Sequence, residues 1–165
     1  FYYWITARAE PALYGFVADL VYTRTRSGQS VIRIEEAIAW LNHRLRLTGK
    51  AWTPTVLKKV ARGMMAALRD FGILEGAVRK RIATVNLCPE AFALIAFCLH
   101  DMGATGRDLV RHPDWRLFLL GEAEVERLLM ECHQHGWLKF EAAGDLRRTE
   151  FPSATFKEYA HVVLG

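Results

Sequence analysis

The chain has 165 residues and a formal net charge of +4. Hydrophobic residues make up 52% of it and charged residues 24%, which excludes a disordered chain and predicts one ordinary domain or two small ones. The longest strongly apolar run, LCPEAFALIAFCL (87–99), is shorter than the roughly 18–20 residues that cross a bilayer. Composition and length therefore predict a globular protein without a membrane partner.

The three cysteines, Cys88, Cys98 and Cys132, are widely spaced and show no pattern. Such spacing does not support a disulfide framework and favours a reducing, cytoplasmic location. The chain begins FYYW without a methionine, so we expect the natural protein to have residues before Phe1. No signal peptide is visible in the sequence.

Charge is unevenly spread along the chain. Residues 1–85 carry 14 Lys and Arg against 6 Asp and Glu, a net charge of +8. Residues 86–165 carry 8 against 12, a net charge of −4. A basic half beside an acidic half predicts that the first half meets a polyanion. A solvated, Arg-rich surface with no ligand is the alternative.

Helical patterns fill the first part of the chain. PALYGFVADLVY (11–22) spaces its apolar residues along one helix face, and TRTRSGQS (23–30) is typical of a loop. IRIEEAIAWLNHRLRLTG (32–49) predicts a second helix. A third, better defined helix has Thr53 as its N-cap and Pro54 at its first position, and it ends at Gly72. We expect its core face to comprise Leu57, Val60, Met64, Leu68 and Phe71.

After Gly72 the pattern changes to short runs of β-branched residues. ILEGAVRKRIATVNL (73–87) predicts an antiparallel hairpin with a turn at Gly76. A second helical group follows, and its last long helix (122–136) precedes a hairpin over 137–151 with a turn at residues 142–145. The segment 65–76 thus echoes 129–140: each has a helix end, a glycine and then a hairpin.

The echo predicts the fold class: mainly α, with two tandem winged-helix-like units, each helical with a small two-stranded hairpin. The first, basic unit would span residues 1–88 and the second 89–165.

Cys132, His133 and His135 raise the question of a metal site. Structural zinc normally takes a second pair of ligands at comparable spacing, and the sequence has none. On a helix, His133 would point about 100° away from the other two side chains. Histidines beside Gly136 also suit a helix C-terminus. We therefore expect a helix end here, with metal binding as the alternative.

Motifs of catalysis are absent from the sequence: it has no GxSxG, GxGxxG, HExxH or Walker-type loop. The paired carboxylates, such as Glu35 and Glu36, fall at helix starts, where capping explains them. We expect a protein that is not an enzyme and has no cofactor and no small-molecule substrate, although an enzyme stays an alternative.

The basic residues of the first half have a geometry that suits DNA. In a winged helix-turn-helix protein, the helix before the wing enters the major groove of DNA. Lys and Arg side chains on such a surface neutralise phosphates. The exposed face of the third helix has no Asn or Gln to read base edges, so we expect low sequence specificity. The predicted DNA contacts are Arg44, Arg46, Lys50, Thr55, Lys58, Lys59, Arg62, Arg69, Arg79, Lys80 and Arg81.

A protein-binding module is the alternative to a DNA-binding one. The second unit suits it better, because Glu126 and Glu131 offset Arg147 and Arg148. We expect Trp137 and Phe140 to be exposed there and available to a partner.

Four stretches of the sequence resemble the BrxA-type proteins of BREX bacteriophage-defence systems. They are PALYGFVADLVY, WTPTVLKKVARGMMAALRDFGIL, HPDWRLFLLGEAEVERLLMECHQHGWLKFEAAGDLRR and FPSATFKEYAHVVL. The most specific pieces are HPDW at 112–115 followed by Leu117 and Phe118, and DFGIL at 70–74.

The resemblance implies a mostly helical protein with winged-helix-like parts. It would bind double-stranded DNA without catalysis and act beside other BREX proteins, which include a methyltransferase and an ATPase. Such proteins have carried an inner-membrane label, with which the absence of a spanning segment here disagrees.

Overall fold

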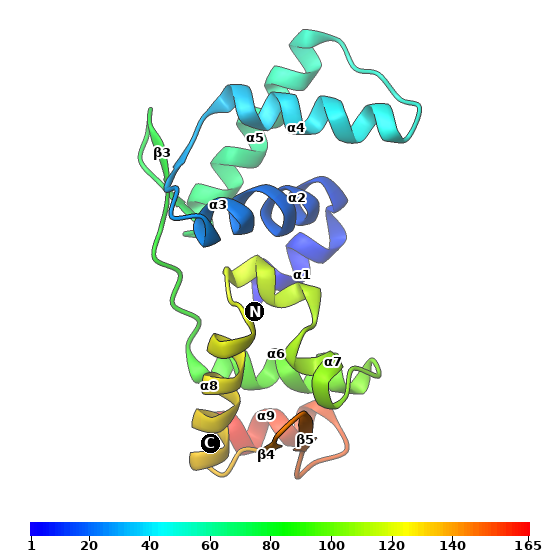
Figure 1. The fold of residues 1–165 in the computed structure, drawn as a ribbon, viewed down its shortest axis with the longest axis vertical. Helices are drawn as coiled ribbons and strands as arrows, with labels where there is room; N and C mark the ends of the chain where they lie inside the picture. Colours follow the sequence, from blue (N-terminus) through cyan, green and yellow to red (C-terminus); the bar gives the residue numbers. More distant parts are fainter. The chain divides into compact units, whose positions relative to one another are not determined.

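A computed structural model describes residues 1–165, and the chain is mainly α, as predicted. Its contacts divide it into two compact units. The N-terminal unit comprises Tyr2–Val85 and Arg116–Leu119; the C-terminal unit comprises Phe1, Asn86–Trp115 and Leu120–Gly165 (Figure 1). The division into winged-helix-like units at residues 1–88 and 89–165 stays a prediction. None of the helices combines the length and apolar character that crossing a bilayer requires.

The N-terminal unit opens with a helical run that includes a π-helical stretch, η1. Its elements are α1 (Tyr2–Ala9), α2 (Pro11–Gly15), η1 (Phe16–Val21) and α3 (Tyr22–Arg26). The predicted helix over 11–22 is thus confirmed, but helix continues into the predicted loop 23–30. Helix α1 was not predicted from the sequence.

Two longer helices, α4 (Ile34–Leu47) and α5 (Pro54–Asp70), cross and pack together (Figure 1). The predicted N-cap of α5 is confirmed, because the Val56 N–H donates to Thr53 Oγ1 at 3.4 Å. Of the predicted core face, Leu57, Met64 and Leu68 are buried and Val60 and Phe71 are half-buried. One face of α5 is therefore fixed in the core, and its other face meets solvent.

A three-stranded antiparallel sheet completes the N-terminal unit. Its strands β1 (Val31–Ile32), β2 (Leu74–Glu75) and β3 (Lys80–Ile82) lie in the order β1-β3-β2. The hairpin of β2 and β3 was predicted and β1 was not, because two residues are too few to show a period. Pairing of Val31 with Arg81 gives β1 its place in the sheet.

In the C-terminal unit, several helices precede a hairpin in the chain and one helix follows it. Its elements are α6 (Pro89–Asp101), α7 (Gly106–Val110), the start of the 3-10 helix η2 (Pro113–Phe118), α8 (Glu122–Gln134), β4 (Lys139–Ala143), β5 (Leu146–Glu150) and α9 (Phe156–Leu164). The hairpin was predicted with its turn correctly placed, since Ala143 pairs with Leu146. The helix α9 was not predicted.

The predicted exposure of Phe140 is wrong: its side chain is 3% exposed. Side chains alternate along a strand, so Phe140 shares a face with the buried Leu138. Strand β4 also contacts α8, the helix that precedes it. Trp137 is half-buried, with its ring stacked on His135 at 4.5 Å between centroids.

The sequence echo is visible in the backbone of the two helix ends. After α5 and after α8, a glycine with positive φ closes the helix, and the same two hydrogen bonds form. This is the Schellman pattern, in which two terminal carbonyls accept from the residues that leave the helix. At the end of α5, the N–H of Gly72 donates to the carbonyl oxygen of Arg69 and that of Ile73 to the carbonyl oxygen of Leu68. At the end of α8, the N–H of Gly136 donates to the carbonyl oxygen of His133 and that of Trp137 to the carbonyl oxygen of Cys132; the four distances are 2.8–3.1 Å.

Candidate nucleic-acid interface

The solvent face of α5 presents cations without ion-pair partners. Lys58, Lys59 and Arg62 are exposed, and none of them forms a salt bridge. Thr55 is exposed in the first turn of the same helix. Since the core face of α5 is fixed by Leu57, Met64 and Leu68, a 3.6-residue period holds these polar side chains toward solvent.

A tight turn shapes the wing, which we define as β2, β3 and the residues 76–79 between them. Gly76 has φ +89°, and a Cβ on it would overlap the carbonyl oxygen of Arg79. The Lys80 ammonium donates to Gly76 O at 2.6 Å, so its charge lies against this turn. Arg81 lies opposite Glu75 in the ladder, while Arg79 is exposed at the end of the turn.

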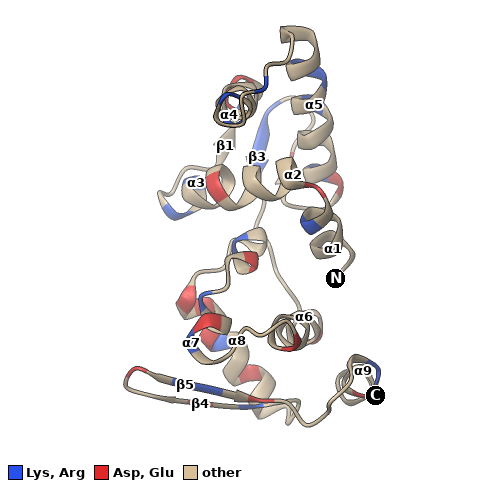
Figure 2. Ribbon diagram, turned by 90° about the vertical axis from the view of Figure 1, so that its right-hand side faces the viewer, with Lys and Arg blue, Asp and Glu red and all other residues tan.

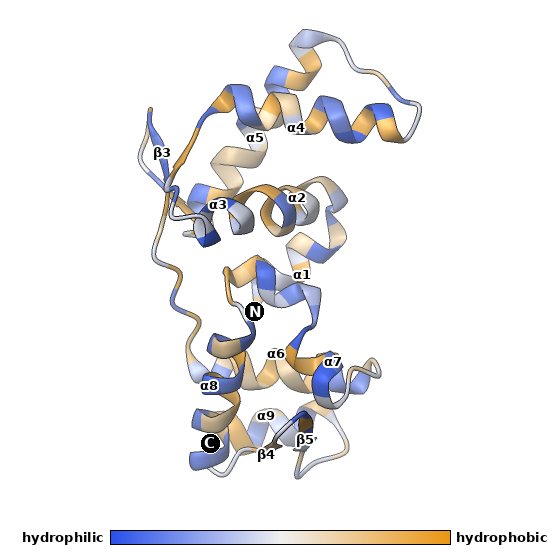
Figure 3. Cartoon of the chain, viewed as in Figure 1, coloured by the Kyte–Doolittle hydropathy of each residue, from blue (hydrophilic) through white to orange (hydrophobic).

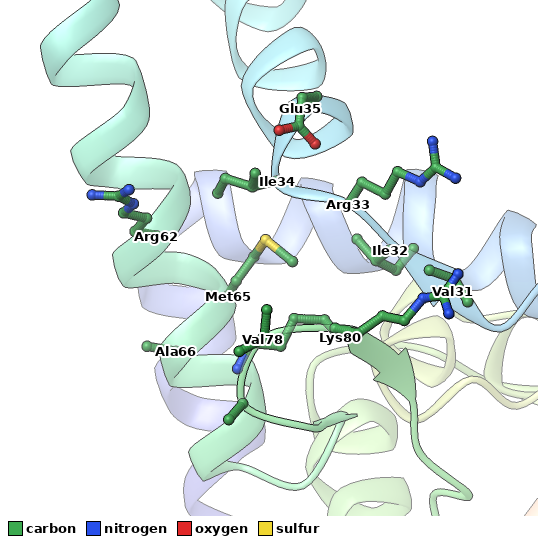
Figure 4. A pocket seen from close by; sticks show the side chains of 12 residues that line it. Val31, Ile32, Arg33, Ile34, Glu35, Arg62, Met65, Ala66, Val78 and Lys80 are labelled. Carbon is green, nitrogen blue, oxygen red and sulfur yellow. The ribbon is translucent and has the colours of Figure 1, made fainter.

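A pocket of about 610 Å³ lies between α5 and the wing (Figure 4). Ile32, Met65 and Val78 contribute apolar surface to it, and basic side chains surround that surface. The structure thus brings together four cations and one carboxylate around the pocket: Arg33, Arg62, Arg79, Lys80 and Glu35.

Arg33 belongs to this group, although it was not among the residues predicted from the sequence. It precedes α4, where its N–H donates to Glu36 Oε2 at 2.8 Å, and its side chain is free of any salt bridge. The only signal in the sequence is its place between two apolar residues, Ile32 and Ile34. The pairing of β1 with β3 is what brings Arg33 to the pocket, and the sequence around Arg33 does not predict that pairing.

The predicted residues at the end of α4 form a separate group. Arg44 and Lys50 line another pocket, of about 370 Å³, together with Trp40 and Trp52. Arg44 also lies 3.9 Å from Asp19, and Arg46 is exposed nearby in sequence without an ion pair. This pocket shares no lining residue with the pocket beside the wing.

Arg69 contributes little free charge to the face of α5. Its guanidinium donates to Asp70 Oδ1 at 2.8 and 3.1 Å. Eight predicted cations remain without a carboxylate partner: Arg46, Lys50, Lys58, Lys59, Arg62, Arg79, Lys80 and Arg81. Figure 2 shows β3 as a basic strand.

The C-terminal unit handles its cations differently. Five of its arginines form ion pairs within the unit: Arg107 with Asp145, Arg111 with Glu122, Arg127 with Glu131, Arg147 with Glu126 and Arg148 with Glu150. An arginine that already holds a carboxylate gains less from a phosphate, because the internal pair must be given up. The free arginines therefore lie in the N-terminal unit, and the C-terminal unit keeps only the lysines Lys139 and Lys157 unpaired.

The cluster of Cys132, His133 and His135 does not converge on one point. Cys132 is buried, its thiol donates to Pro89 O at 3.7 Å, and burial raises its pKa to about 12. His133 is exposed and accepts at Nδ1 from the Phe140 N–H at 3.4 Å. No group of three or more His, Cys, Asp or Glu side chains in the structure is arranged to hold a metal ion.

These features define the N-terminal unit as a small helical module with a three-stranded sheet and a patch of free cations beside it. The chain belongs to the BrxA family, whose model matches residues 1–97. Membership points to a protein of a BREX bacteriophage-defence system. The stretches of resemblance beyond residue 97 lie outside this match. Neither the curated proteins nor the solved structures contain a match to the chain.

Proposed function

We propose that the chain is a double-stranded DNA-binding subunit of a BREX system, with low sequence specificity and no catalytic step of its own. The observation that carries the proposal is the patch of unpaired cations shared by α5 and the wing. The protein would act in the cytoplasm, beside other BREX proteins.

The order of elements supports a winged helix in the N-terminal unit. A helix, a strand, two helices and two strands follow one another, and the first strand pairs with the last to give the order β1-β3-β2. In this arrangement α5 would enter the major groove, as the second helix of a helix-turn-helix does, and the wing would lie on the backbone.

The chemistry of the patch supports contacts with phosphates more than with bases. Lys58, Lys59, Arg62 and Arg79 can each neutralise a phosphate, which releases counterions from the duplex. The hydroxyl of Thr55, near the start of α5, can donate a hydrogen bond to a phosphate oxygen. No amide side chain stands on this face to read adenine.

Charge reversal on α5 tests the proposal. We expect Lys58→Glu/Lys59→Glu to weaken binding to a random-sequence duplex by about two orders of magnitude in a mobility-shift assay. The slope of log affinity against log salt should lose about one unit of magnitude for each phosphate contact removed. Adding Arg62→Glu should weaken binding further.

The matched control reverses two lysines of the other unit. Lys139 and Lys157 are exposed and without salt bridges, so Lys139→Glu/Lys157→Glu changes the net charge by the same amount. We expect this variant to bind the duplex nearly as the unmodified protein does. Equal losses in both variants would show that net charge, and not the α5 surface, attracts DNA. Unchanged binding by the α5 variant would place the DNA surface elsewhere.

A scaffold role without DNA contact is the second candidate. The C-terminal unit favours it, because its arginines are paired and it exposes apolar side chains such as Leu146 and Leu164. If no duplex binds at low salt, this candidate replaces the first.

A further inference from the structure

We propose that the groove along the C-terminal half of α4 is a docking site for an acidic amphipathic helix of a partner protein. We name it the α4 groove and define it by its lining: Pro11, Ala12, Trp40, Leu41, Arg44, Leu45, Leu47, Thr48, Lys50 and Trp52. The groove lies within the N-terminal unit, and the docking role is separate from the proposed DNA contact.

Two apolar side chains of the α4 groove are exposed to solvent. Leu47 is 67% exposed and Trp52 is 39% exposed, whereas Leu41 on the same helix is buried. Figure 3 shows hydrophobic positions recurring along α4 to its C-terminal end. Exposed apolar surface that is rimmed by polar residues commonly marks an interaction site.

The dimensions of the α4 groove suit a helix. It follows α4 from Trp40 to Thr48, a length of about 12 Å at 1.5 Å per residue. Two turns of a partner helix cover the same length, so apolar residues at i, i+3 or i+4, and i+7 would fill it. A volume of about 370 Å³ accommodates a few such side chains.

Charge at the rim selects an acidic partner. Arg44 and Lys50 are the charged residues of the lining, and no carboxylate is among them. Lys50 has no ion pair, and Arg44 is held only loosely by Asp19, at 3.9 Å. Carboxylates that flank the apolar face of a partner would be complementary to both.

Trp40, one of the two tryptophans in the lining, is poorly placed to stack with a nucleic-acid base. Trp40 and Phe16 pack in a T-shaped arrangement with 5.5 Å between ring centroids, and the far end of the indole lies 3.1 Å from the position of a Cβ on Gly15. The guanidinium of Arg44 covers a face of the same indole at 5.6 Å. A base needs an open aromatic face on which to stack, and Trp40 does not offer one on the side that Arg44 covers.

The test uses a fluorescent synthetic peptide that presents Leu at i, i+3 and i+7 of a helix with Glu between them. We expect its anisotropy to rise with the intact protein, and a Lys-for-Glu version of the peptide not to bind. Leu47→Glu and Lys50→Glu should each weaken binding by about tenfold or more. Leu146→Glu is the matched control, because Leu146 is 65% exposed on the other unit, and it should leave peptide binding unchanged.

DNA binding by the same variants separates this proposal from the first. Lys58→Glu/Lys59→Glu should keep the peptide and lose the duplex, while Leu47→Glu should keep the duplex and lose the peptide. Circular dichroism melting of each variant confirms that it folds. Equal peptide binding by Leu47→Glu and Leu146→Glu would overturn the docking site. So would a labelled single-stranded oligonucleotide that binds in a Leu47-dependent way while the acidic peptide does not.

Discussion

Gly63 lies in the middle of α5, on its exposed face and directly after Arg62. A Cβ there would have no heavy atom within 4 Å, so neither space nor packing in the unbound chain requires glycine. Glycine inside a helix costs about 0.5–1 kcal/mol relative to alanine. Close approach of a DNA backbone to α5 would explain a residue that the fold alone does not favour.

Gly63→Ala should therefore separate stability from binding. We expect the free energy of unfolding to rise by about 0.5–1 kcal/mol in urea denaturation, because the unfolded chain loses freedom. Duplex affinity should fall, since the new methyl group would stand between α5 and the phosphates. Ala39→Gly, at an exposed site on α4, is the reciprocal control and should lower stability while sparing the duplex. A more stable Gly63→Ala protein with undiminished affinity would show that DNA does not approach α5 closely.

At the scale of elements, the wing depends on one glycine. Gly76 has φ +89°, and any Cβ there would overlap the carbonyl of Arg79. Gly76→Ala should distort the turn at a cost of about 1–3 kcal/mol and move Arg79 and Arg81. We expect weaker duplex binding with nearly unchanged helical circular dichroism, because α5 is held by its own core face.

The other hairpin supplies the comparison for this substitution. Gly144, at the turn of β4 and β5, has φ +53° and open space around the position of a Cβ. Gly144→Ala should therefore strain its hairpin less and leave duplex affinity as it is. Should both substitutions reduce affinity alike, the wing would have no special part in DNA contact.

The elements that sequence could predict are those with local signals. Thr53 and Pro54 mark the start of α5, and the Gly144–Asp145 turn marks the second hairpin. Elements defined by distant partners were missed: β1 is a strand only because Val31 pairs with Arg81, 50 positions later in the chain. Periodicity within a window does not report such a pairing.

The same limit applies to the candidate site. The cations of α5 and the wing were predicted from spacing, and the pocket brings Arg62, Arg79 and Lys80 together. Arg33 joins them through β1, which is why spacing could not find it. Arg44 and Lys50 were predicted in the same set, but they line the α4 groove, because α4 ends away from the wing (Figure 1).

At the scale of the whole molecule, the two units differ in how many of their cations form ion pairs. The N-terminal unit leaves cations such as Lys58 and Arg62 free, whereas the C-terminal unit pairs Arg107, Arg147 and others internally. Net charge does not report this difference, because it does not record which arginines already hold a carboxylate. DNA binding should therefore depend on N-terminal substitutions far more than the net charge of +4 suggests.

Stability of the whole chain should fall in alkaline solution, and the direction follows from three buried acids. Burial raises the pKa of Cys132 from its ordinary value near 9 to about 12, with a smaller contribution from the charge of Glu131. Burial also raises the pKa of Tyr3 and of Tyr159 above the ordinary value near 10. In each case the folded state keeps a proton that the unfolded state releases more easily.

The stabilising contribution of Cys132 is thus complete below about pH 9 and is lost as pH rises toward 12. The free energy of unfolding should fall by about 1.4 kcal/mol per pH unit for each such group once its unfolded form titrates. Urea denaturation at pH 8, 9 and 10 measures this slope. Cys132→Ala should make the slope between pH 9 and 10 shallower, whatever the cost of the substitution itself, whereas Cys88→Ala removes an exposed thiol and should not. Identical slopes in the two variants would show that the Cys132 thiol titrates as freely in the folded chain as in the unfolded one.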